Sequence, residues 1–426
     1  MTYLSLPLKI GRERSPRCVI IVENLPVPFD RRVWQEANAL KTAGWQVSVI
    51  CPKSAQYSLS YEEIDGIAVY RHPLPLEARG KAAFLIEYAA ALFHEARLLL
   101  KIAVTRGFDV VQACNPPDLI FLVAAPYKLF GKKFIFDQHD AGPELYLAKY
   151  RRRDFFHRFL VLAERCTFWL ADAVISANQT YREIAIERGG KRPEDVVTVY
   201  SIPTKERIRR VEPDESLRGD ARVVLGYVGI IADQDGVDHL VHMVHHLVRY
   251  HGRDEVRAVV VGDGPALASV KALACSLGVE DNIVFTGYLQ GQALLAALST
   301  FDIGVIPDPV NEYNDTISMN KVFEYSALGI PAVSYDLRET RRLLGDAGSF
   351  APEPTPASLA EASLPLIDDE GYRREKGTKA QRLAEDKFSW KREAEKYVTA
   401  YGRMVEAEAV PELSATVERR DQATTV

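Results

Sequence analysis

The sequence predicts an α/β fold in which two doubly wound, Rossmann-like domains follow one another and face each other across a cleft. Three observations lead to this prediction. The chain has 426 residues, more than one ordinary hydrophobic core accommodates. Short apolar runs, typical of strands buried on both faces, alternate with longer stretches of helical periodicity. One polar stretch, from Pro203 to Asp220, interrupts this alternation, which then restarts.

The bulk composition narrows the class of protein. Apolar residues make up 47% and charged residues 26%, which is typical of a globular protein and not of a disordered one. A formal charge of −5 is small for this length and argues against a general nucleic-acid binder. The five cysteines are scattered without zinc-ligand spacing, which favours a reducing, cytoplasmic location. No apolar run approaches the roughly 18 residues that a spanning helix needs.

The first half of the chain contains the first set of expected strands. Each is a short apolar run: 18–22, 47–51, 110–113, 134–136, 173–176 and 196–200. Between the first two, the spacing of apolar residues predicts a helix with Asp30 as its N-cap and Gly44 at its end. Strand, helix and strand in this order form the βαβ unit of a parallel sheet.

The second half repeats the pattern, and the chain then ends in a helix. The expected strands are 223–228, 258–261, 283–286, 303–306 and 332–335. We therefore expect one domain over residues 1–205 and another over 206–386. A C-terminal helix should follow over 387–409, and the Glu-, Ala- and Thr-rich end, 410–426, predicts a disordered tail.

Two candidate sites follow strands of the first half. Arg31 and Arg32 stand near the start of the first expected helix, where backbone N–H groups favour anions. The alternative is a surface turn followed by a solvated helical turn. His139 lies just beyond the end of the strand 134–136, where doubly wound domains place ligand-contacting side chains. A structural histidine is an equally good interpretation from the sequence alone.

The segment from Asn314 to Pro331 is the most informative part of the second half. Ser318 or Asn320 could cap a helix whose first turn carries Lys321, with Glu324 on the same face. A cation is electrostatically unfavourable at a helix N-terminus but is well placed to hold a diphosphate there. Glu324 could accept from ribose hydroxyls. The alternative is a surface ion pair between the two side chains.

Three further motifs leave alternatives open. Gly262 and Gly264 would let a flat ring approach the backbone, although tight turns often need glycine for geometry alone. Asp233 and Asp235 form an Asp-x-Asp motif, but its place in a short loop does not support a metal site. The stretch Lys149–Phe159 interleaves five basic residues with aromatics. This pattern suits an anionic membrane surface or a solvated helix whose aromatics face the core.

Taken together, these motifs make the chain resemble the retaining glycosyltransferases of family 4, which have the GT-B fold. The resemblance runs from about residue 18 to 402, nearly the whole chain. The chain is similar in particular to the branch of this family found among capsule, exopolysaccharide and O-antigen enzymes. The matching motifs are 29–37 (FDRRVWQEA), 115–118 (NPPD), 137–140 (DQHD), 143–146 (PELY), 234–238 (QDGVD), 261–265 (VGDGP) and 320–331 (NKVFEYSALGIP).

The resemblance implies an activity and a role for each candidate. The enzyme would transfer a hexose, with retention, from a UDP- or GDP-linked sugar to a lipid-linked or polysaccharide acceptor, without a metal or other cofactor. The first domain would bind the acceptor and the second the nucleotide-sugar, with the C-terminal helix crossing back to the first. His139 would contact the donor sugar, Gly262 and Gly264 the base, and Glu324 the ribose. Ser318, Asn320 and Lys321 would belong to the phosphate-binding segment.

The chain departs from the family pattern at the phosphate site. Where an Arg and a Lys commonly follow the glycine at Gly229, this sequence has Ile230 and, roughly, Asp235. Thr316 stands where the first of two paired glutamates would fall. Phosphate binding would then depend on Lys321, on backbone N–H groups and on Arg31 or Arg32. We also expect peripheral membrane attachment through Lys149–Phe159, and no nucleic-acid partner.

Two other functions stay open at this point. A GT-B-type nucleotide-sugar epimerase or hydrolase would need an acid/base pair beside the sugar, for which only His139 and Asp140 are candidates. A non-catalytic, degenerate subunit is favoured by the missing Arg and Lys. The presence of His139, Lys321 and Glu324 argues against it.

Overall fold

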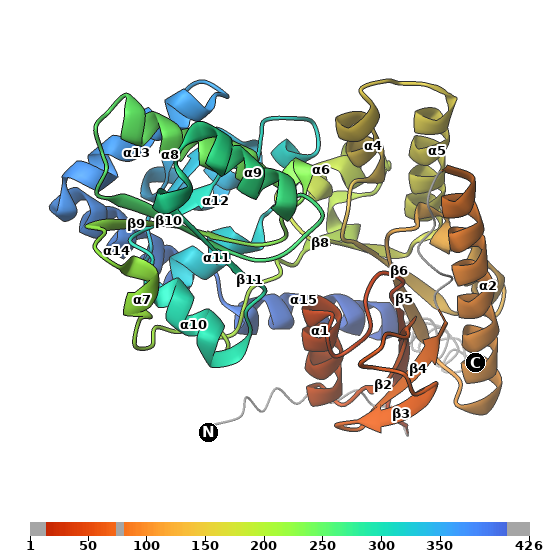
Figure 1. Ribbon diagram of the computed structural model, residues 1–426. Helices are drawn as coiled ribbons and strands as arrows, with labels where there is room; N and C mark the ends of the chain where they lie inside the picture. Colours follow the sequence, from red (N-terminus) through yellow and green to blue (C-terminus); the bar gives the residue numbers. More distant parts are fainter. Residues whose placement is uncertain (1–13, 74–80, 407–426) are drawn as a thin grey trace, which may run out of the picture. The chain divides into compact units, whose positions relative to one another are not determined.

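The computed structural model describes residues 14–73 and 81–406, which divide into two compact units (Figure 1). The first unit contains the described residues up to Tyr200 together with those from Lys391 onward, and the second spans Ser201–Trp390. Most of the stretch expected to be a linker, 203–220, therefore begins the second unit. The predicted tail, 410–426, lies outside the described residues.

The first unit is built on an eight-stranded sheet in the order β3-β4-β2-β1-β5-β6-β7-β8. All neighbouring pairs are parallel except β3 and β4. The strands are β1 (Arg17–Ile21), β2 (Gln46–Pro52), β3 (Tyr61–Ile64), β4 (Ile67–His72), β5 (Val110–Cys114), β6 (Lys133–Gln138), β7 (Ala173–Ser176) and β8 (Val196–Thr198).

The hairpin of β3 and β4 was missing from the sequence prediction. Asp65 and Gly66 both have positive φ angles, 49° and 77°, as a two-residue type I′ turn requires. The Asp-Gly pair was therefore an available signal for this hairpin. β4 is fully buried although it ends in Arg71 and His72, so its polar end obscured the apolar run.

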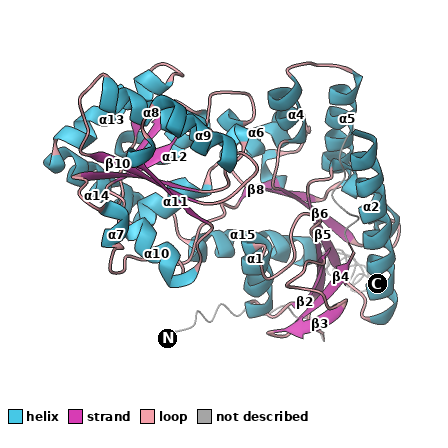
Figure 2. Ribbon diagram, viewed as in Figure 1, coloured by secondary structure: helices cyan, strands magenta, loops and turns pink. Residues whose placement is uncertain are grey.

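The helices of the first unit begin and end at recognisable signals. The predicted N-cap at Asp30 is confirmed, because its side chain accepts from the backbone N–H of Val33 at 3.1 Å. The helices from the first part of the chain are α1 (Arg31–Thr42), α2 (Lys81–Thr105), α3 (Phe121–Lys128), α4 (Gly142–Tyr150), α5 (Phe155–Leu170) and α6 (Gln179–Glu187). They surround a sheet whose inner strands are almost entirely buried (Figure 2).

The last helix, α15 (Trp390–Glu406), packs into the first unit although it follows the second unit in sequence. Tyr397 and Tyr401 are completely buried there, and their hydroxyls both donate to Gln112 of β5. Trp45 packs edge-on against Tyr401, with ring centroids 5.1 Å apart.

The second unit contains a six-stranded parallel sheet in the order β11-β10-β9-β12-β13-β14. Its strands are β9 (Val223–Val228), β10 (Val256–Val261), β11 (Ile283–Gly287), β12 (Ile303–Ile306), β13 (Ala332–Tyr335) and β14 (Ser349–Ala351). β14, a three-residue edge strand, was not predicted. The helices are α7 (Glu215–Arg218), α8 (Val237–Arg249), α9 (Leu267–Leu277), α10 (Gly291–Ser299), α11 (Asn320–Ala327), α12 (Arg338–Leu344), α13 (Pro356–Asp368) and α14 (Glu370–Asp386).

Each sheet reverses its strand order once. In the first unit the reversal lies between β1 and β5, and in the second it lies between β9 and β12. Ligands of open α/β sheets bind outside the carboxyl ends of the strands at this reversal. The loops that follow β1, β5 and β6, and those that follow β9 and β12, are therefore the places to look for a site in each unit.

Within the part of the chain that the structure describes, no helix is both long enough and apolar enough to cross a membrane.

Candidate active-site residues

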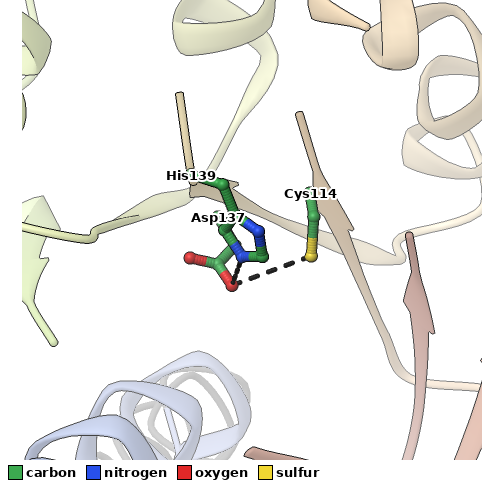
Figure 3. A group of neighbouring side chains, drawn as sticks. All are labelled: Cys114, Asp137 and His139. Carbon is green, nitrogen blue, oxygen red and sulfur yellow. Dashed lines mark hydrogen bonds and ion pairs between the residues drawn. The ribbon is translucent and has the colours of Figure 1, made fainter. Parts of the chain in front are cut away.

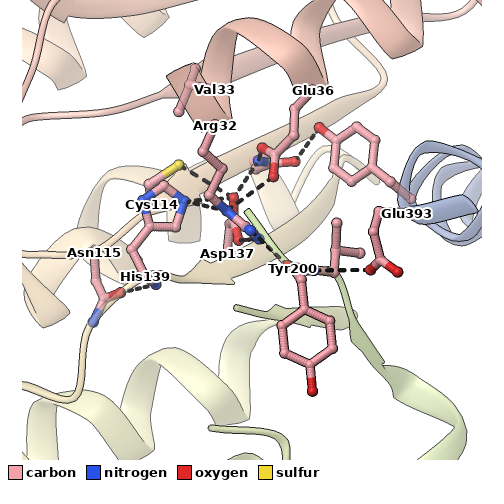
Figure 4. Close-up of polar contacts among 12 residues, drawn as sticks. Arg32, Val33, Glu36, Cys114, Asn115, Asp137, His139, Tyr200 and Glu393 are labelled. Carbon is pink, nitrogen blue, oxygen red and sulfur yellow. Dashed lines mark hydrogen bonds and ion pairs between the residues drawn. The ribbon is translucent and has the colours of Figure 1, made fainter. Parts of the chain in front are cut away.

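A buried polar cluster lies at the strand-order reversal of the first unit (Figure 4). Asp137 is the penultimate residue of β6 and is completely buried, and His139 follows the end of that strand. Arg32 and Glu36 reach the same point from the first turns of α1. Arg32 is only 7% exposed, and its guanidinium donates to Asp137 Oδ1 at 2.8 Å.

Asp137 also orients His139. Its Oδ2 lies 2.8 Å from His139 Nε2, which is also 3.1 Å from Arg32 Nε. An imidazole nitrogen cannot donate to one of these neighbours and accept from the other at once. The shorter contact to a carboxylate favours a proton on Nε2, which makes Nδ1 the acceptor in the neutral ring. Arg32 Nε also lies 3.1 Å from Glu36 Oε1, an ion-pair distance.

The two carboxyl groups of this cluster differ in ionisation. Burial alone would raise the pKa of Asp137, but Arg32 and His139 outweigh burial and hold that pKa well below its usual range. Burial and the charge of Asp137 raise the pKa of Glu36 well above its usual range, although Arg32 and Gln112 oppose them. One arginine therefore balances the Asp137 carboxylate, and the surroundings of Glu36 disfavour its ionised form.

Asn115 holds the backbone of the loop that carries His139. Its Oδ1 accepts from the backbone N–H groups of His139 and Asp140, at 2.8 and 3.2 Å. Its Nδ2 donates to Asp140 O and to Asp118 Oδ1, both at 2.8 Å. Both ends of one amide side chain are used, so the loop is fixed on the sheet independently of the His139 ring.

Cys114, Asp137 and His139 offer atoms within 4.8 Å of one another, close enough for metal ligands (Figure 3). The surroundings do not suit a cation. Arg32 already brings a positive charge to both Asp137 and His139. Burial, together with the charge of Asp137, raises the pKa of the Cys114 thiol well above its usual range, which disfavours the thiolate that binds metals. We therefore assign these three residues to the ion-pair network.

A second buried cluster lies at the reversal of the other sheet. Asp308 follows β12, and its Oδ2 lies 2.6 Å from Lys321 Nζ of α11. The ammonium group also lies 4.8 Å from the centre of the Tyr227 ring, a cation–π distance. Burial raises the pKa of Asp235 in the neighbouring loop to about 6, although Lys321 lowers it. Lys321 is thus buried, and it forms an ion pair with Asp308, which follows β12.

The start of α11 differs from the prediction. Neither Ser318 nor Asn320 is the N-cap: Met319 occupies that position and makes no side-chain cap hydrogen bond. Met319 still has an extended backbone, with ψ of 134°, so the helix begins one residue later than a cap at Ser318 requires. The N-cap residue itself therefore offers no side-chain acceptor to the first-turn N–H groups. Glu324 lies one turn further on and is 9% exposed.

Gly262 and Gly264 are required by contact between two loops. A Cβ added to Gly262, whose φ is +151°, would lie 1.8 Å from Gly229 O. One added to Gly264 would lie 2.4 Å from Ile231 O. Protein backbone fills both Cβ positions, so these glycines pack the loop after β10 against the loop after β9. This supports the geometric interpretation that the sequence left open.

The two arginines of α1 are placed differently. Arg31 is exposed, whereas Arg32 is committed to Asp137, to Val199 O at 2.6 Å and to the neighbours described above. The interpretation of Arg32 as a phosphate ligand is therefore corrected, because an ion pair with Asp137 holds its guanidinium inside the first unit. Arg31 keeps that interpretation as a prediction.

Sequence reasoning missed Asp137, Asn115, Gln112 and Asp308 as parts of these clusters. A signal existed for three of them. Gln112 interrupts the apolar strand 110–113, Asp137 directly follows the apolar run 134–136, and Asp308 follows 303–306 after one proline. A charged or polar side chain in such a place must find a partner or leave the sheet. Their partners come from distant parts of the chain and could not be read from spacing.

The raised pKa of Glu36 predicts a pH effect on stability. An acid whose pKa is raised by folding stabilises the fold below its unfolded pKa, near 4.3, and this contribution is lost as the pH rises towards the folded value. Glu36→Gln mimics the protonated form. Between pH 5 and pH 8 the free energy of unfolding of the wild type should fall relative to Glu36→Gln, by up to about 1.4 kcal/mol per pH unit.

Urea unfolding followed by tryptophan fluorescence measures this effect, because Trp34, Trp45 and Trp169 all lie in the first unit. Glu395→Gln on the exposed face of α15 is the matched control and should leave the pH profile of the wild type unchanged. Parallel profiles for Glu36→Gln and the wild type would show that Glu36 is ionised in the folded state.

Comparison with known proteins agrees with this architecture. Residues 30–201 match the model of the glycosyl transferase 4-like domain, and residues 222–369 match that of the glycosyl transferases group 1. The first match falls almost entirely in the first unit and the second in the second unit.

Individual relatives are more distant. The chain is 28% identical to alpha-D-kanosaminyltransferase of Streptomyces kanamyceticus over 42% of this chain and 46% of that protein. It spans about half the length of the curated relatives it matches.

Solved structures align over nearly the whole chain. Sucrose-phosphate synthase from Thermosynechococcus elongatus aligns with a TM-score of 0.76 at 16% identity, over 92% of this chain and 100% of that one. Anabaena Alr3699/HepE in complex with UDP aligns with a TM-score of 0.66 at 14% identity, over 92% and 99%. At these identities the likeness concerns the fold. With a glycosyl transferase 4-like domain followed by a group 1 domain, the chain belongs to the glycosyltransferases of GT-B fold.

Proposed function

We propose that this protein transfers a hexose, with retention, from a UDP- or GDP-linked sugar to a lipid-linked or polysaccharide acceptor. One observation carries the proposal. Each unit places a cluster that contains a predicted site residue, His139 or Lys321, at the strand-order reversal of its own sheet. The family matches assign both units to glycosyltransferase domains, and the solved relative with UDP supports a nucleotide donor.

The donor would bind to the second unit. Its diphosphate would approach the first turn of α11, whose N-cap residue, Met319, makes no side-chain hydrogen bond to the backbone. Lys321 lies in that turn and would share its charge between Asp308 and the phosphates. Glu324 would accept from the ribose hydroxyls. Stabilising the charge that develops on the leaving diphosphate is the main contribution expected of this cluster.

The sugar would be handled by His139. Because Asp137 accepts from Nε2, Nδ1 would accept a hydroxyl hydrogen of the donor sugar. No carboxylate stands out as a covalent nucleophile, since Asp137 is committed to Arg32 and His139. We therefore favour a front-face reaction, in which the acceptor hydroxyl attacks from the side that the diphosphate leaves. Without a metal ion, the diphosphate charge would be stabilised by Lys321, to the extent that Asp308 shares it, and by the N–H groups at the start of α11.

One observation favours a non-catalytic subunit as the second candidate. Lys321 is already neutralised by Asp308, and the position of the family's usual arginine holds Ile230, a 66% exposed apolar residue. Such a subunit would bind nucleotide-sugars without turning them over.

The donor site makes the first prediction of this function. If Glu324 holds the ribose, Glu324→Ala should weaken binding of UDP or GDP at least about tenfold, because one or two hydrogen bonds to a charged group are lost. Isothermal titration calorimetry measures this affinity. The wild type should bind equally well in EDTA and in magnesium, since no metal is assigned to the site.

Glu385→Ala is the control, because Glu385 is an exposed carboxylate of the same unit on α14, away from the loops that follow β9 and β12. The assignment of Glu324 fails if its variant binds both nucleotides as tightly as the control does. Loss of wild-type binding in EDTA, restored by magnesium, would instead implicate Asp233 and Asp235.

We further propose that the first unit attaches to the inner face of the cytoplasmic membrane. Arg151, Arg152 and Arg153 are exposed in the loop between α4 and α5. Along α5, Phe155, Leu162 and Trp169 recur at seven-residue spacing and are 84%, 60% and 80% exposed. Side chains at this spacing share one helical face.

Helices α2 and α3 also carry exposed apolar side chains. α3 packs against both α2 and α5. The exposed apolar side chains of these two helices are Phe93, Leu100 and Val104 on α2, and Leu122, Leu129 and Phe130 on and just beyond α3. An exposed apolar face bordered by arginines has the chemistry of an anionic membrane surface, near which each basic residue contributes about 1 kcal/mol.

Replacing Arg151, Arg152 and Arg153 with Glu should abolish flotation with vesicles that contain anionic phosphatidylglycerol. Wild-type binding should fall as salt rises, because the attraction is screened. The control, Arg374, Lys379 and Arg382→Glu, makes the same charge change at exposed positions of the second unit and should float like the wild type. Equal flotation of both triple variants, or no flotation of the wild type at low salt, would contradict membrane attachment.

A further inference from the structure

The C-terminal helix is joined to the His139 cluster through one buried side chain. Gln112 of β5 is completely buried and forms four hydrogen bonds. Its Oε1 accepts from the hydroxyls of Tyr397 and Tyr401, at 2.8 and 2.7 Å. Its Nε2 donates to Glu36 Oε2 at 2.9 Å and to Asp137 Oδ2 at 3.0 Å.

This arrangement gives the amide a single orientation. The two tyrosine hydroxyls present their hydrogens to Oε1, and the carboxyl groups on the other side face Nε2. A flipped amide would set its oxygen against the Asp137 carboxylate, which can only accept, and would lose the hydrogen bond that Nε2 donates to it. Oriented as observed, Gln112 uses every donor and acceptor position of its side chain, as a buried polar group requires.

Asp137 Oδ2 is the atom that connects this amide to the histidine. The same oxygen that receives Gln112 Nε2 lies 2.8 Å from His139 Nε2. Rotation of the Asp137 carboxylate would therefore alter both contacts at once. The backbone of His139 is held separately by Asn115, so the carboxylate governs the ring and not the loop.

A second contact from α15 reaches the same ion pair. Glu393 Oε2 accepts from the backbone N–H of Tyr200 at 2.9 Å. The preceding residue, Val199, accepts from Arg32 Nη1 through its carbonyl oxygen at 2.6 Å. α15 thus contacts Gln112, which bonds to Asp137, and the chain segment whose carbonyl group accepts from Arg32.

We propose that Tyr397 and Tyr401 are positioning residues for the transfer reaction: through Gln112 they fix the Asp137 carboxylate that orients the His139 ring. This inference rests on the proposed function for its effect on turnover. It assigns to α15 a role beyond covering the sheet. Loss of both hydroxyls leaves Gln112 Oε1 without its donors, so the amide and the carboxylate gain alternative orientations.

The test compares Tyr397→Phe, Tyr401→Phe and the double variant with Val405→Ala, a control on the same helix. Val405 is buried, so its truncation weakens the packing of α15 without removing a hydrogen bond from Gln112. Release of UDP or GDP from UDP-glucose and GDP-mannose gives kcat, and calorimetry gives the affinity for the free nucleotide. All measurements are made well below the melting temperature of each variant.

The double variant should lose about tenfold or more in kcat, as misplacement of a catalytic group does, with nucleotide affinity unchanged. Each single variant should lose less, because one donor remains on Oε1, and Val405→Ala should stay near the wild type. Unchanged kcat in the double variant would overturn the proposal. A loss of kcat in Val405→Ala as large as that in the double variant would also overturn it, since packing alone would then explain the effect.

A spectroscopic measurement keeps the inference testable if the wild type turns over neither sugar nucleotide, in which case the proposed function itself fails. In protein labelled with ¹⁵N-histidine, the ring signals of His139, assigned from the His139→Gln variant, report which nitrogen carries the proton. They should indicate a proton on Nε2 in the wild type and in Val405→Ala, and should shift in the double variant. Ring signals unchanged by loss of both hydroxyls would refute the coupling regardless of activity.

Discussion

The ion pair between Arg32 and Asp137 is the contact on which the organisation of the first unit's strand ends depends. Both side chains are buried, and an isolated charge in their place would be severely destabilising. The pair persists because donors surround it: Asp137 receives Arg32, His139 and Gln112, and Arg32 also reaches Val199 O. Removing one partner from such a pair typically costs about 3–5 kcal/mol, because the other charge is left buried. α1, β5, β6 and the chain at residue 199 therefore meet at one charge-balanced point.

The second unit uses the same principle with its charges arranged differently. Lys321 is balanced by Asp308 and lies over the Tyr227 ring, at the point where its sheet reverses strand order. In the first unit the cation is an arginine, whose several donors hold fixed partners. In the second it is a lysine, a point charge on a flexible stem that can be shared between Asp308 and an incoming anion. This difference fits a division of labour in which the first unit positions groups around the sugar and the second accommodates the diphosphate.

Much of the fold followed from local pattern, whereas the site followed only in part. An uninterrupted apolar run made the buried strand Val223–Val228 predictable. A capping residue, Asp30, did the same for the start of the first helix. β4 was missed because Arg71 and His72 are buried at its end, and burial of a polar side chain depends on partners distant in sequence. The same limit hid the roles of Asp137 and Gln112: their partners on α1 and α15 lie far away along the chain. His139 could be predicted as a site residue because it follows the end of a strand, and the topology of the sheet alone places such residues at the ligand side.

The central claim is that the first unit acts on the reacting sugar through His139 while the second holds the nucleotide. The most direct measurement compares wild type and His139→Gln for two quantities: the rate at which UDP or GDP is released from its sugar nucleotide, and the affinity for the free nucleotide. The account predicts a fall of about a hundredfold in the rate, the typical effect of losing one well-placed catalytic hydrogen-bonding group, with the affinity within about twofold of the wild type. An unchanged rate, or a rate that falls only in proportion to lost nucleotide affinity, would contradict it.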